Sequence, residues 1–227
     1  MILKHAGKTK DVYQCDDKNL LLKFKDDVTV ENGVFNPGAN HVGLKIDGIG
    51  NENLRMSKYF FELINQNGIS THFVSANLND NSMIVKEAEV FGQGIEVICR
   101  YVAKGSFVKR YGAYIKEGQP LNAYVEMTLK DDLREDPLIT SQALEILNIM
   151  NLDTYNLITK MTQSICKLIQ NELHNHDLDL LDIKLEFGLD TQSNTIMLID
   201  EISTGNMRVA KNGVVLKPFE LSQYFKG

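Results

Sequence analysis

The feature that most constrains the fold is a regular alternation of charged and apolar side chains late in the chain. The charged members are Asp182, Lys184 and Glu186, and the apolar members between and after them are Ile183, Leu185 and Phe187. A repeat of two residues is the repeat of a β-strand, so the two kinds of side chain take opposite faces. We expect the apolar face to be buried. The other face then carries two carboxylates with an amine between them on a rigid element.

A second apolar strand is expected at 196–202, and it delivers Asp200 and Glu201 near its end. The polar segment 189–195 between the two strands is typical of a hairpin turn. If the pairing register is even, Asp200 lies on the same face as Glu186. Two carboxylates on a rigid floor suit Mg²⁺ and the phosphates that it carries. The alternative, a solvated charged face, accounts for one or two of these charges but less well for both strands.

Length and charge limit the class of protein. A chain of 227 residues is one large domain or two small ones, and 43% hydrophobic with 24% charged residues is ordinary for a globular protein. The net charge of −6 argues against a general nucleic-acid or anionic-membrane surface, where a basic excess is expected. A local group of lysines and arginines can still bind a small anion.

The cysteines and the N-terminus indicate a cytoplasmic protein. The three cysteines are far apart and odd in number, so we expect neither a disulfide framework nor a cysteine zinc site; they are Cys15, Cys99 and Cys166. The first ten residues contain no apolar leader, and no apolar run approaches the length that spans a membrane.

Two lysine-bearing segments are candidates for binding nucleotide phosphates. Residues 2–25 are predicted to form short strands around a turn in which Gly7, Lys8 and Lys10 could lie over phosphates. Lys86, on a short strand expected within 82–90, could reach a phosphate as well. A solvated basic turn and an exposed strand lysine are the simpler alternatives.

A third basic segment follows the strongly β-forming run 94–102. Arg100, Lys104, Lys109 and Arg110 lie within eleven residues, and Ser106 follows a glycine where a helical turn can start. A hydroxyl, an arginine and a helix start together can bind a phosphate monoester. A solvated basic patch explains this run equally well.

The remaining elements are predicted from period and turn residues. We expect a long loop at 26–51, a helix at 52–66, strands at 71–74 and 119–127, a charged loop at 129–137, and a helix at 140–150. A longer helix capped by Asp153 follows, whose core face carries Leu157, Met161, Ile165, Leu168 and Ile169. Its end carries His174 and His176, which do not share a face and do not indicate a metal site. A hairpin at 211–214 and a short helix end the chain.

Several of these segments, in this order, resemble the SAICAR synthetase family of purine biosynthesis. The matching stretches are 7–13, 100–110, 129–132 with 136–137, 181–188, and 200–203 with Arg208. The run from Asp182 to Gly188 is the most specific of them, and the run from Ala103 to Arg110 is nearly as specific. Residues 7–10 indicate the family only when they are taken together with the other stretches.

The resemblance implies an ATP-dependent carboxylate–amine ligase that joins CAIR, a ribonucleotide, to L-aspartate and gives SAICAR, ADP and phosphate through an acyl phosphate. It implies an α+β fold, with a small N-terminal antiparallel β domain (1–92), a larger α+β domain (93–227), and ATP in the cleft between them. ATP and Mg²⁺ are the implied cofactors, the partners are the small-molecule substrates, and a homodimer is expected.

Residue roles follow by position. Glu186 and Asp200 resemble the Mg²⁺ carboxylates, and Lys8 and Lys10 resemble the triphosphate flap, with Lys86 as a further ATP contact. Lys184 and Lys130 would face the reacting groups, and Asp182 would orient or deprotonate the aspartate amine. Arg100, Ser106 and Arg208 resemble the site for the CAIR 5′-phosphate, and Asp136 would contact the second substrate.

Two segments depart from the pattern of the family. Gly205 stands where the family has an acidic residue, and the neighbouring Asn206 could supply a hydrogen bond without the charge. Near 45–51 the family has Lys-Gly and two Asn, and here Lys45 could serve from a shifted position. A related ligase with a different phosphorylated acid, and a non-catalytic nucleotide-binding module, are therefore the alternatives. Retention of Lys8, Lys10 and the residues of the alternating strand argues against the second alternative.

Overall fold

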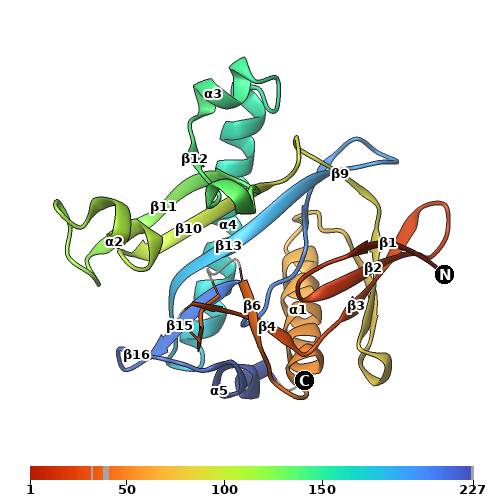
Figure 1. Ribbon diagram of the computed structural model, residues 1–227, viewed down its shortest axis with the longest axis horizontal. Coiled ribbons are helices and arrows are strands. Elements are labelled where there is room, and N and C mark those ends of the chain that lie inside the picture. The colour runs from red at the N-terminus through yellow and green to blue at the C-terminus, as the bar shows by residue number, and fades with distance from the viewer. Residues whose placement is uncertain (32, 38–40, 226–227) are drawn as a thin grey trace. The chain divides into compact units, whose positions relative to one another are not determined.

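The computed structural model describes residues 1–31, 33–37 and 41–225, and these form an α+β protein of two compact units (Figure 1). The first unit comprises Met1–Glu89, Gly188–Asn206 and Lys217–Gly227, and the second comprises Val90–Phe187 and Met207–Leu216. These units are discontinuous in sequence, unlike the contiguous domains expected at 1–92 and 93–227, whose existence as folding domains stays a prediction.

The N-terminal meander is confirmed as part of a five-stranded antiparallel sheet in the first unit. Its strands, in spatial order, are β1 (Ile2–Ala6), β2 (Lys10–Gln14), β3 (Asn19–Phe24), β8 (Ser82–Lys86) and β7 (Phe73–Asn77). Leu22, Phe24, Met83 and Val85 alternate toward the interior and are buried. The turn between β1 and β2 carries Lys8.

The predicted loop at 26–51 is wrong for most of its described residues, because they form a small antiparallel sheet. Its strands are β5 (Val34–Phe35), β4 (Asp27–Glu31) and β6 (His41–Lys45). Val28 and Val30 alternate on β4 and pack with Ile49 in a buried cluster. This short alternation was hidden among glycines and asparagines, whose turn preference suggested loop. Residues 32 and 38–40 lie outside the described part of the chain.

The main helix of the first unit is α1 (Ile49–Gln66), which begins three residues before the predicted start. It contacts β3, β7 and the C-terminal α5 (Pro218–Ser222). Phe60 is fully buried, and its ring lies 4.8 Å from that of Phe225 in the final 3₁₀ turn, η3 (Gln223–Phe225). A further 3₁₀ turn, η1 (Leu78–Asp80), joins β7 to β8. The predicted terminal helix is thus confirmed.

A larger antiparallel sheet forms the second unit. Its strands, in spatial order, are β12 (Leu138–Ile139), β11 (Pro120–Leu129), β10 (Ile95–Val102), β13 (Asp179–Asp190), β15 (Met207–Lys211) and β16 (Val214–Val215). Along β13 the predicted alternation is confirmed: Ile183, Leu185 and Phe187 are buried, and Lys184 and Glu186 are partly exposed. The pairs Arg100–Asp182, Ile98–Lys184 and Glu96–Glu186 lie opposite one another on β10 and β13.

β13 continues past Phe187 into the first unit, where the predicted hairpin follows. The backbone N–H of Asp190 donates to the carbonyl of Thr195 at 2.9 Å, and β14 (Ile196–Ile199) pairs with β13. The short strand β9 (Ala88–Val90) lies at the sequence boundary between the two units. The turn after β14 carries Asp200.

Helices cover the sheet of the second unit. The long α4 (Leu152–His174) contacts β10 and β11, and Figure 1 shows it running behind them; α2 (Ser106–Tyr111), the 3₁₀ turn η2 (Asp132–Arg134) and α3 (Ser141–Ile146) complete the unit. Asn151 rather than Asp153 caps α4, since its side-chain oxygen accepts from the N–H of Thr154 at 2.8 Å.

The predicted core face of α4 is only partly right, because Leu157 is 49% exposed. The buried positions are Ile158, Thr162, Ile165, Cys166, Ile169 and Leu173. The three cysteines are free, as expected, with Cys99 and Cys166 buried. No helix in the described part of the chain has the length and apolar character needed to cross a membrane.

Candidate active site

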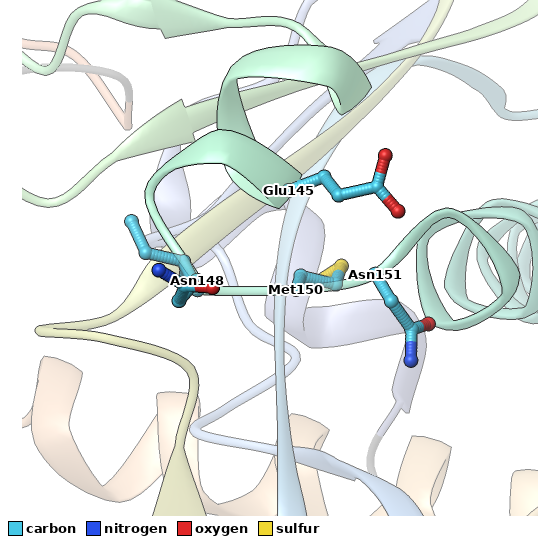
Figure 2. Close-up of a pocket in the computed structure, with 5 residues that line it drawn as sticks. Glu145, Asn148, Met150 and Asn151 are labelled. Carbon is cyan, nitrogen blue, oxygen red and sulfur yellow. The ribbon is translucent and has the colours of Figure 1, made fainter.

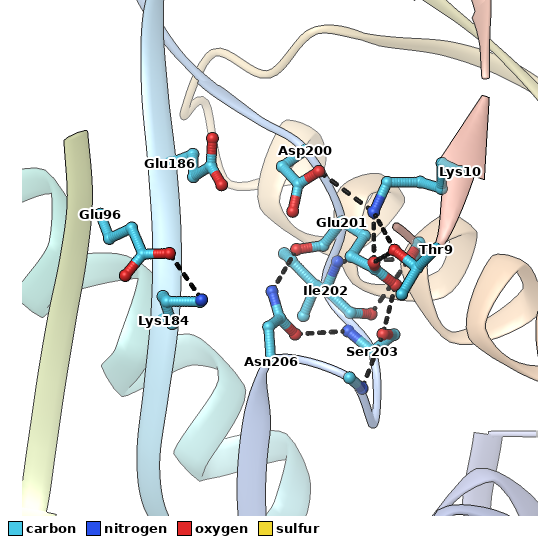
Figure 3. Close-up of polar contacts among 12 residues, drawn as sticks. Thr9, Lys10, Glu96, Lys184, Glu186, Asp200, Glu201, Ile202, Ser203 and Asn206 are labelled. Carbon is cyan, nitrogen blue, oxygen red and sulfur yellow. Dashed lines mark hydrogen bonds and ion pairs between the residues drawn. The ribbon is translucent and has the colours of Figure 1, made fainter. Parts of the chain in front are cut away.

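In the first unit, Lys10 lies at the centre of a largely buried ionic cluster in which Asp200 is partly exposed (Figure 3). Its ammonium forms an ion pair with Asp200 at 3.1 Å and a closer one with Glu201. The side chain is only 10% exposed and lies under the ring of Phe24, with 5.5 Å from the nitrogen to the ring centroid. Burial lowers the pKa of Lys10, but attraction to Asp200 and then Glu201 outweighs it and raises the pKa overall. The ammonium is therefore charged and fixed.

Glu201 is held on its other side by hydroxyl groups. The hydroxyl of Ser203 donates to one carboxylate oxygen at 2.5 Å, and that of Thr9 donates to the other at 3.4 Å. Thr9 is next to Lys10 on the flap, so two consecutive flap residues contact one carboxylate. Charge-assisted hydrogen bonds of this kind are stronger than neutral ones. These contacts hold Thr9 and Lys10 of the flap against Glu201, in the turn that follows β14.

The acidic turn, residues 200–206, has an unusual conformation that side chains from elsewhere stabilise. Asp200 has φ of 69°, which is rare for a residue other than glycine. Ser57 on α1 accepts from the N–H of Ile202 at 3.2 Å and donates to its carbonyl, and Thr204 donates to Asn53 at 2.6 Å. These contacts tie the turn to α1.

Asn206 closes this turn with two hydrogen bonds. Its side-chain oxygen accepts from the N–H of Ser203 at 2.9 Å, and its amide donates to the carbonyl of Glu201 at 2.5 Å. The residue is 7% exposed. That Asn206 supplies a hydrogen bond in place of the acidic residue of the family stays a prediction. Its present role is to hold the turn.

Three further candidate phosphate ligands, Lys8, Lys45 and Lys86, lie on the surface of the first unit. Lys8 is exposed at the tip of the flap. Lys86, at the end of β8, is 45% exposed and forms an ion pair with Asp190 at 3.4 Å. Lys45, the last residue of β6, is exposed. Their roles as phosphate ligands stay predictions.

In the second unit, the structure brings together the three residues predicted for the substrate phosphate. Arg100 donates to the hydroxyl of Ser106 at 2.9 Å, and Arg100 and Arg208 both donate to the same oxygen of Asp182, at 3.0 and 2.6 Å. Arg100 is 2% exposed and Asp182 is 4% exposed. We call this group, Arg100, Ser106, Asp182 and Arg208, the arginine corner.

Glu126 on β11 offsets part of the positive charge of the arginine corner. It accepts from Arg100 at 2.9 Å and from Arg110, and it is 3% exposed. Three guanidinium groups thus share two carboxylates, Glu126 and Asp182. The remaining positive charge suits an anionic ligand better than a neutral one. Lys104 pairs with Glu117 at 2.7 Å, further from the buried group.

Further along the same strands, two lysines each face a glutamate. The ammonium of Lys184 lies 2.6 Å from Glu96 (Figure 3). The other carboxylate oxygen of Glu96 accepts from Thr128 at 3.1 Å. The ammonium of Lys130 lies 2.7 Å from Glu186. The predicted catalytic lysines are therefore close to the predicted metal carboxylate on β13.

Asp136 is placed by the turn that contains it. Its carboxylate accepts from the N–H of Asp131 at 2.7 Å, and its φ is 48°. The carboxylate thus closes the 129–137 loop, and its contact with a substrate stays a prediction.

A pocket in the second unit is lined by none of the predicted site residues. Glu145, Asn148, Ile149, Met150 and Asn151 line it between α3 and α4 (Figure 2). None of them is a predicted ligand, so the arginine corner and the lysine–glutamate pairs define the candidate site instead.

Comparison with known proteins decides the family. The family model for SAICAR synthetase matches residues 3–215. The chain belongs to the SAICAR synthetase family. The predicted α+β fold and the predicted class, an ATP-dependent ligase of purine biosynthesis, are confirmed with it.

Individual relatives agree with this assignment. The phosphoribosylaminoimidazole-succinocarboxamide synthase of Clostridium tetani is 52% identical, with 98% of each chain covered. The enzyme of the same name from Sulfolobus acidocaldarius is 36% identical over 89% of this chain and 81% of its own. A SAICAR synthetase solved in complex with ADP superposes with a TM-score of 0.84 at 29% identity, covering 98% of this chain and 94% of the other.

Sequence reasoning missed several buried polar residues of this SAICAR synthetase family member. Glu96 and Glu126 each interrupt an apolar strand, and that interruption was the available signal. In the sequence, Glu201 stands out only as the neighbour of Asp200, and nothing there indicates its ion pair with Lys10. His72 gave no local signal, because its position near the acidic turn depends on the pairing of distant segments.

The donor set fits magnesium in a limited way. No group of three or more His, Cys, Asp or Glu residues able to hold a metal ion occurs in the described chain. Mg²⁺ commonly takes only one or two protein carboxylates, with water and phosphate oxygens completing its shell. Glu186 and Asp200 supply hard oxygen donors of this kind. They belong to different units, so their joint coordination of one ion stays a prediction.

Proposed function

We propose that this chain joins the carboxylate of CAIR to the amine of L-aspartate, using ATP and an acyl-phosphate intermediate, and releases SAICAR, ADP and phosphate. One structural observation supports this proposal most directly: a single face of β13 carries Asp182 in the arginine corner, then Lys184, then Glu186. The relatives' enzyme name, phosphoribosylaminoimidazole-succinocarboxamide synthase, supports the product, and the substrates are those that the family resemblance implies.

The spacing along β13 fits a ribonucleotide. From Asp182 to Glu186 is four residues, or about 13 Å at the usual strand rise. CAIR has its phosphate at one end and its reacting carboxylate at the other. With the 5′-phosphate at Arg100, Ser106 and Arg208, the carboxylate would extend toward Lys184 and Glu186. Asp182 would then align both arginines before the substrate arrives.

ATP would lie against the first unit. Lys8 at the exposed tip of the flap and the fixed ammonium of Lys10 would contact its phosphates, and Lys86 would supply a further contact. The relative solved with ADP supports use of a nucleotide by this family. Because Lys10 is already held by two carboxylates, it supplies a charge that needs little reordering on binding.

Glu186 and Asp200 would hold Mg²⁺. The bound ion would neutralise charge on the nucleotide phosphates. Lys184 and Lys130 would stabilise the negative charge that develops as the phosphoryl group passes to the CAIR carboxylate. The phosphorylated carboxylate then has a good leaving group, and the aspartate amine can displace it. Asp136 would contact L-aspartate. Asp182 is bound by Arg100 and Arg208 at the phosphate end, so the role at the aspartate amine that the resemblance implies for it does not fit this arrangement.

Product analysis tests the reaction. The protein is incubated with ATP, Mg²⁺, L-aspartate and CAIR, and SAICAR and ADP are measured together. We expect equal amounts of both, and loss of both with Glu186→Ala. The surface variant Glu62→Ala, which removes only an ion pair with Lys58 on α1, is the matched control. ADP release with a different phosphorylated acid, and none with CAIR, would favour the alternative ligase. Full activity of Glu186→Ala would contradict the metal role.

A cytoplasmic location and a homodimer are further parts of this proposal. Nucleotide substrates and three free cysteines agree with the former. Sedimentation of the purified chain, alone and with ADP, tests whether it is a homodimer.

A further inference from the structure

Arg110 is the most exposed of the three arginines that share Glu126 and Asp182. Its side chain is 29% exposed, against 14% for Arg208 and 2% for Arg100. A guanidinium group that reaches the solvent can bind an incoming anion directly, whereas a buried one acts mainly through its neighbours. Arg110 is therefore the arginine of this group that is best placed to meet a ligand.

All three nitrogens of Arg100 already have partners inside the protein. Nε donates to Glu126 at 2.9 Å, and Nη2 donates to Ser106 at 2.9 Å and lies 2.8 Å from Glu126. Nη1 donates to Asp182 at 3.0 Å and to the carbonyl of Lys104 at 3.4 Å. Because the donors of a guanidinium are few and fixed in one plane, Arg100 has little capacity left for a ligand. A bound phosphate therefore needs further donors that reach the solvent.

Helix α2 places Arg110 on the same face as Ser106. The two residues are separated by about one turn, the spacing that brings side chains together on a helix. Nη2 of Arg100 donates to Ser106 and lies 2.8 Å from the Glu126 oxygen that also accepts from Arg110. The Ser106 hydroxyl and the Arg110 guanidinium are thus linked through one nitrogen and one carboxylate oxygen. A phosphate that accepts from Ser106 lies within reach of Arg110.

Two contacts hold Arg110 in this place. Its Nη2 forms an ion pair with Oε1 of Glu126, and its Cζ lies 5.4 Å from the ring centroid of Tyr111. The ring of Phe107 packs against Tyr111, with 4.8 Å between centroids, and against Tyr124 on β11, with 5.6 Å. Helix α2 therefore rests on β11 through its aromatic residues and presents Arg110 to Glu126.

Glu126 uses only one of its two carboxylate oxygens for these arginines. Oε1 accepts from Arg100 and Arg110, whereas Oε2 is buried and has no hydrogen-bond partner among the described residues. A buried carboxylate that serves stability alone is normally bound through both oxygens. A buried ion pair is also weak evidence for stability, because apolar residues of similar volume often replace one without loss. What the shared oxygen does provide is a fixed spacing between two guanidinium groups.

We propose that Arg110 binds the phosphate of the substrate together with the arginine corner, and that Glu126 is the positioning residue that holds Arg110 there. This inference rests on the proposed function for the identity of that substrate, CAIR. The ligand chemistry is a phosphate monoester, since the planar fork of a guanidinium can bind two phosphate oxygens at once.

Arg110→Ala tests the binding role, and because the side chain is partly exposed, its loss should not prevent folding. KM is measured separately for CAIR and ATP. One charge-assisted hydrogen bond is lost, so we expect KM for CAIR to rise by about 10-fold and KM for ATP to stay at the wild-type value. Arg110→Lys keeps the charge but not the planar fork, and its KM for CAIR should lie between the two. The control is Lys116→Ala, which removes a positive charge from an exposed residue in the loop after α2 and should change neither KM.

Glu126→Gln tests the positioning role. It removes the charge at nearly constant size, and KM for CAIR should again rise by about 10-fold. If Glu126 acts by holding Arg110, the two substitutions are not additive, and Arg110→Ala should raise KM for CAIR much less in Glu126→Gln than in the wild type. The same factor in both backgrounds would overturn the positioning role. If Glu126→Gln does not fold, Glu126→Asp, which keeps the charge on a shorter side chain, takes its place in the comparison.

Two results would overturn the binding role of Arg110. One is an unchanged KM for CAIR in Arg110→Ala, and the other is an equal increase in the KM values for CAIR and ATP. Ribose 5-phosphate separates this inference from the proposed function, because it carries a phosphate monoester without the reacting carboxylate. If the wild type fails to convert CAIR, the reaction is wrong, and titration calorimetry with ribose 5-phosphate then decides. Binding about 10-fold weaker in Arg110→Ala supports the inference, and equal binding, or none by the wild type, overturns it.

Discussion

Arg100 and Asp182 form an ion pair across neighbouring strands of the second unit, with 3.0 Å between Nη1 and Oδ2. Their side chains are 2% and 5% exposed, so both groups have lost most of their water. A buried charge is tolerated only when its partner and further hydrogen bonds replace that water. Arg208, bonded to the same oxygen at 2.6 Å, makes Asp182 the anion that holds two arginines in place.

Removing the charge of Asp182 should destabilise the protein and make it depend on an added anion. Asp182→Asn removes the carboxylate to which Arg100 and Arg208 both donate, and Glu126 then remains as a buried carboxylate partner of Arg100 alone. Loss of one partner of a buried pair typically costs about 3 kcal/mol or more. We expect a loss of that order in the free energy of unfolding measured with urea, and a partial recovery in inorganic phosphate.

The control for this prediction is Asp179→Asn on the exposed start of the same strand, where the side chain is 62% exposed. It should change stability little and respond to phosphate as the wild type does. Equal stabilisation of all three proteins by phosphate would mean that the anion does not bind at the arginine corner.

Truncation of Arg208 should separate the two nucleotide sites. Arg208→Ala removes one guanidinium from the arginine corner and leaves the cluster around Lys10 intact. A hydrogen bond between charged groups contributes about 1.5–3 kcal/mol, so KM for CAIR should rise by about 10-fold or more while KM for ATP stays close to the wild-type value. Lys86→Ala is the matched variant, and it should raise KM for ATP while KM for CAIR stays close to the wild-type value. Equal losses for both substrates in Arg208→Ala would contradict the phosphate assignment.

The parts of the fold that the sequence predicted correctly are those with a sustained local pattern. The alternation from Asp182 to Phe187 required a strand with one buried face, and β13 has it. The asparagine–glycine turn at Asn212 likewise required the hairpin of β15 and β16. In these segments, a change of register would expose apolar side chains, so local pattern and global fold agree.

The parts that were missed depend on partners far along the chain. β4 contains only two buried valines, and its alternation has meaning only beside Ile49. Glu126 can be buried because Arg100 and Arg110 reach it from other elements. His72 is placed by pairing with Leu198. A single sequence without its contacts carries no local sign of these pairings.

Gly7 should be indispensable to the shape of the flap. A β-carbon at this position would lie 2.4 Å from the backbone oxygen of Lys10, and the N–H of Gly7 donates to that same oxygen at 2.9 Å. Gly7→Ala must therefore shift the backbone beside Lys10. We expect KM for ATP to rise by about 10-fold, equivalent to about 1.4 kcal/mol, with KM for CAIR little changed.

Gly68→Ala is the control for the flap variant. Gly68 follows α1 with φ of 73°, and a β-carbon there meets no atom within 4 Å. Its cost is limited to the left-handed backbone, about 1 kcal/mol of stability. If Gly68→Ala raises KM for ATP as much as Gly7→Ala does, loss of stability rather than displacement of the flap explains both results.

The buried imidazole of His72 should make stability depend on pH between neutrality and about 4. Its pKa is lowered by burial from 6.5 to about 4, so the unfolded chain takes up a proton at a higher pH than the folded chain. The stabilisation is present above pH 6.5 and is lost as pH falls, reaching about 3 kcal/mol near pH 4. Urea unfolding of the metal-free protein at several pH values measures this loss of stability.

His72→Phe should lose less stability than the wild type over this pH range, because the two proteins have the same other titrating groups. His174→Phe, which changes an exposed ring at the end of α4, should follow the wild type. Parallel curves for the wild type and His72→Phe would show that His72 is not held neutral in the folded chain.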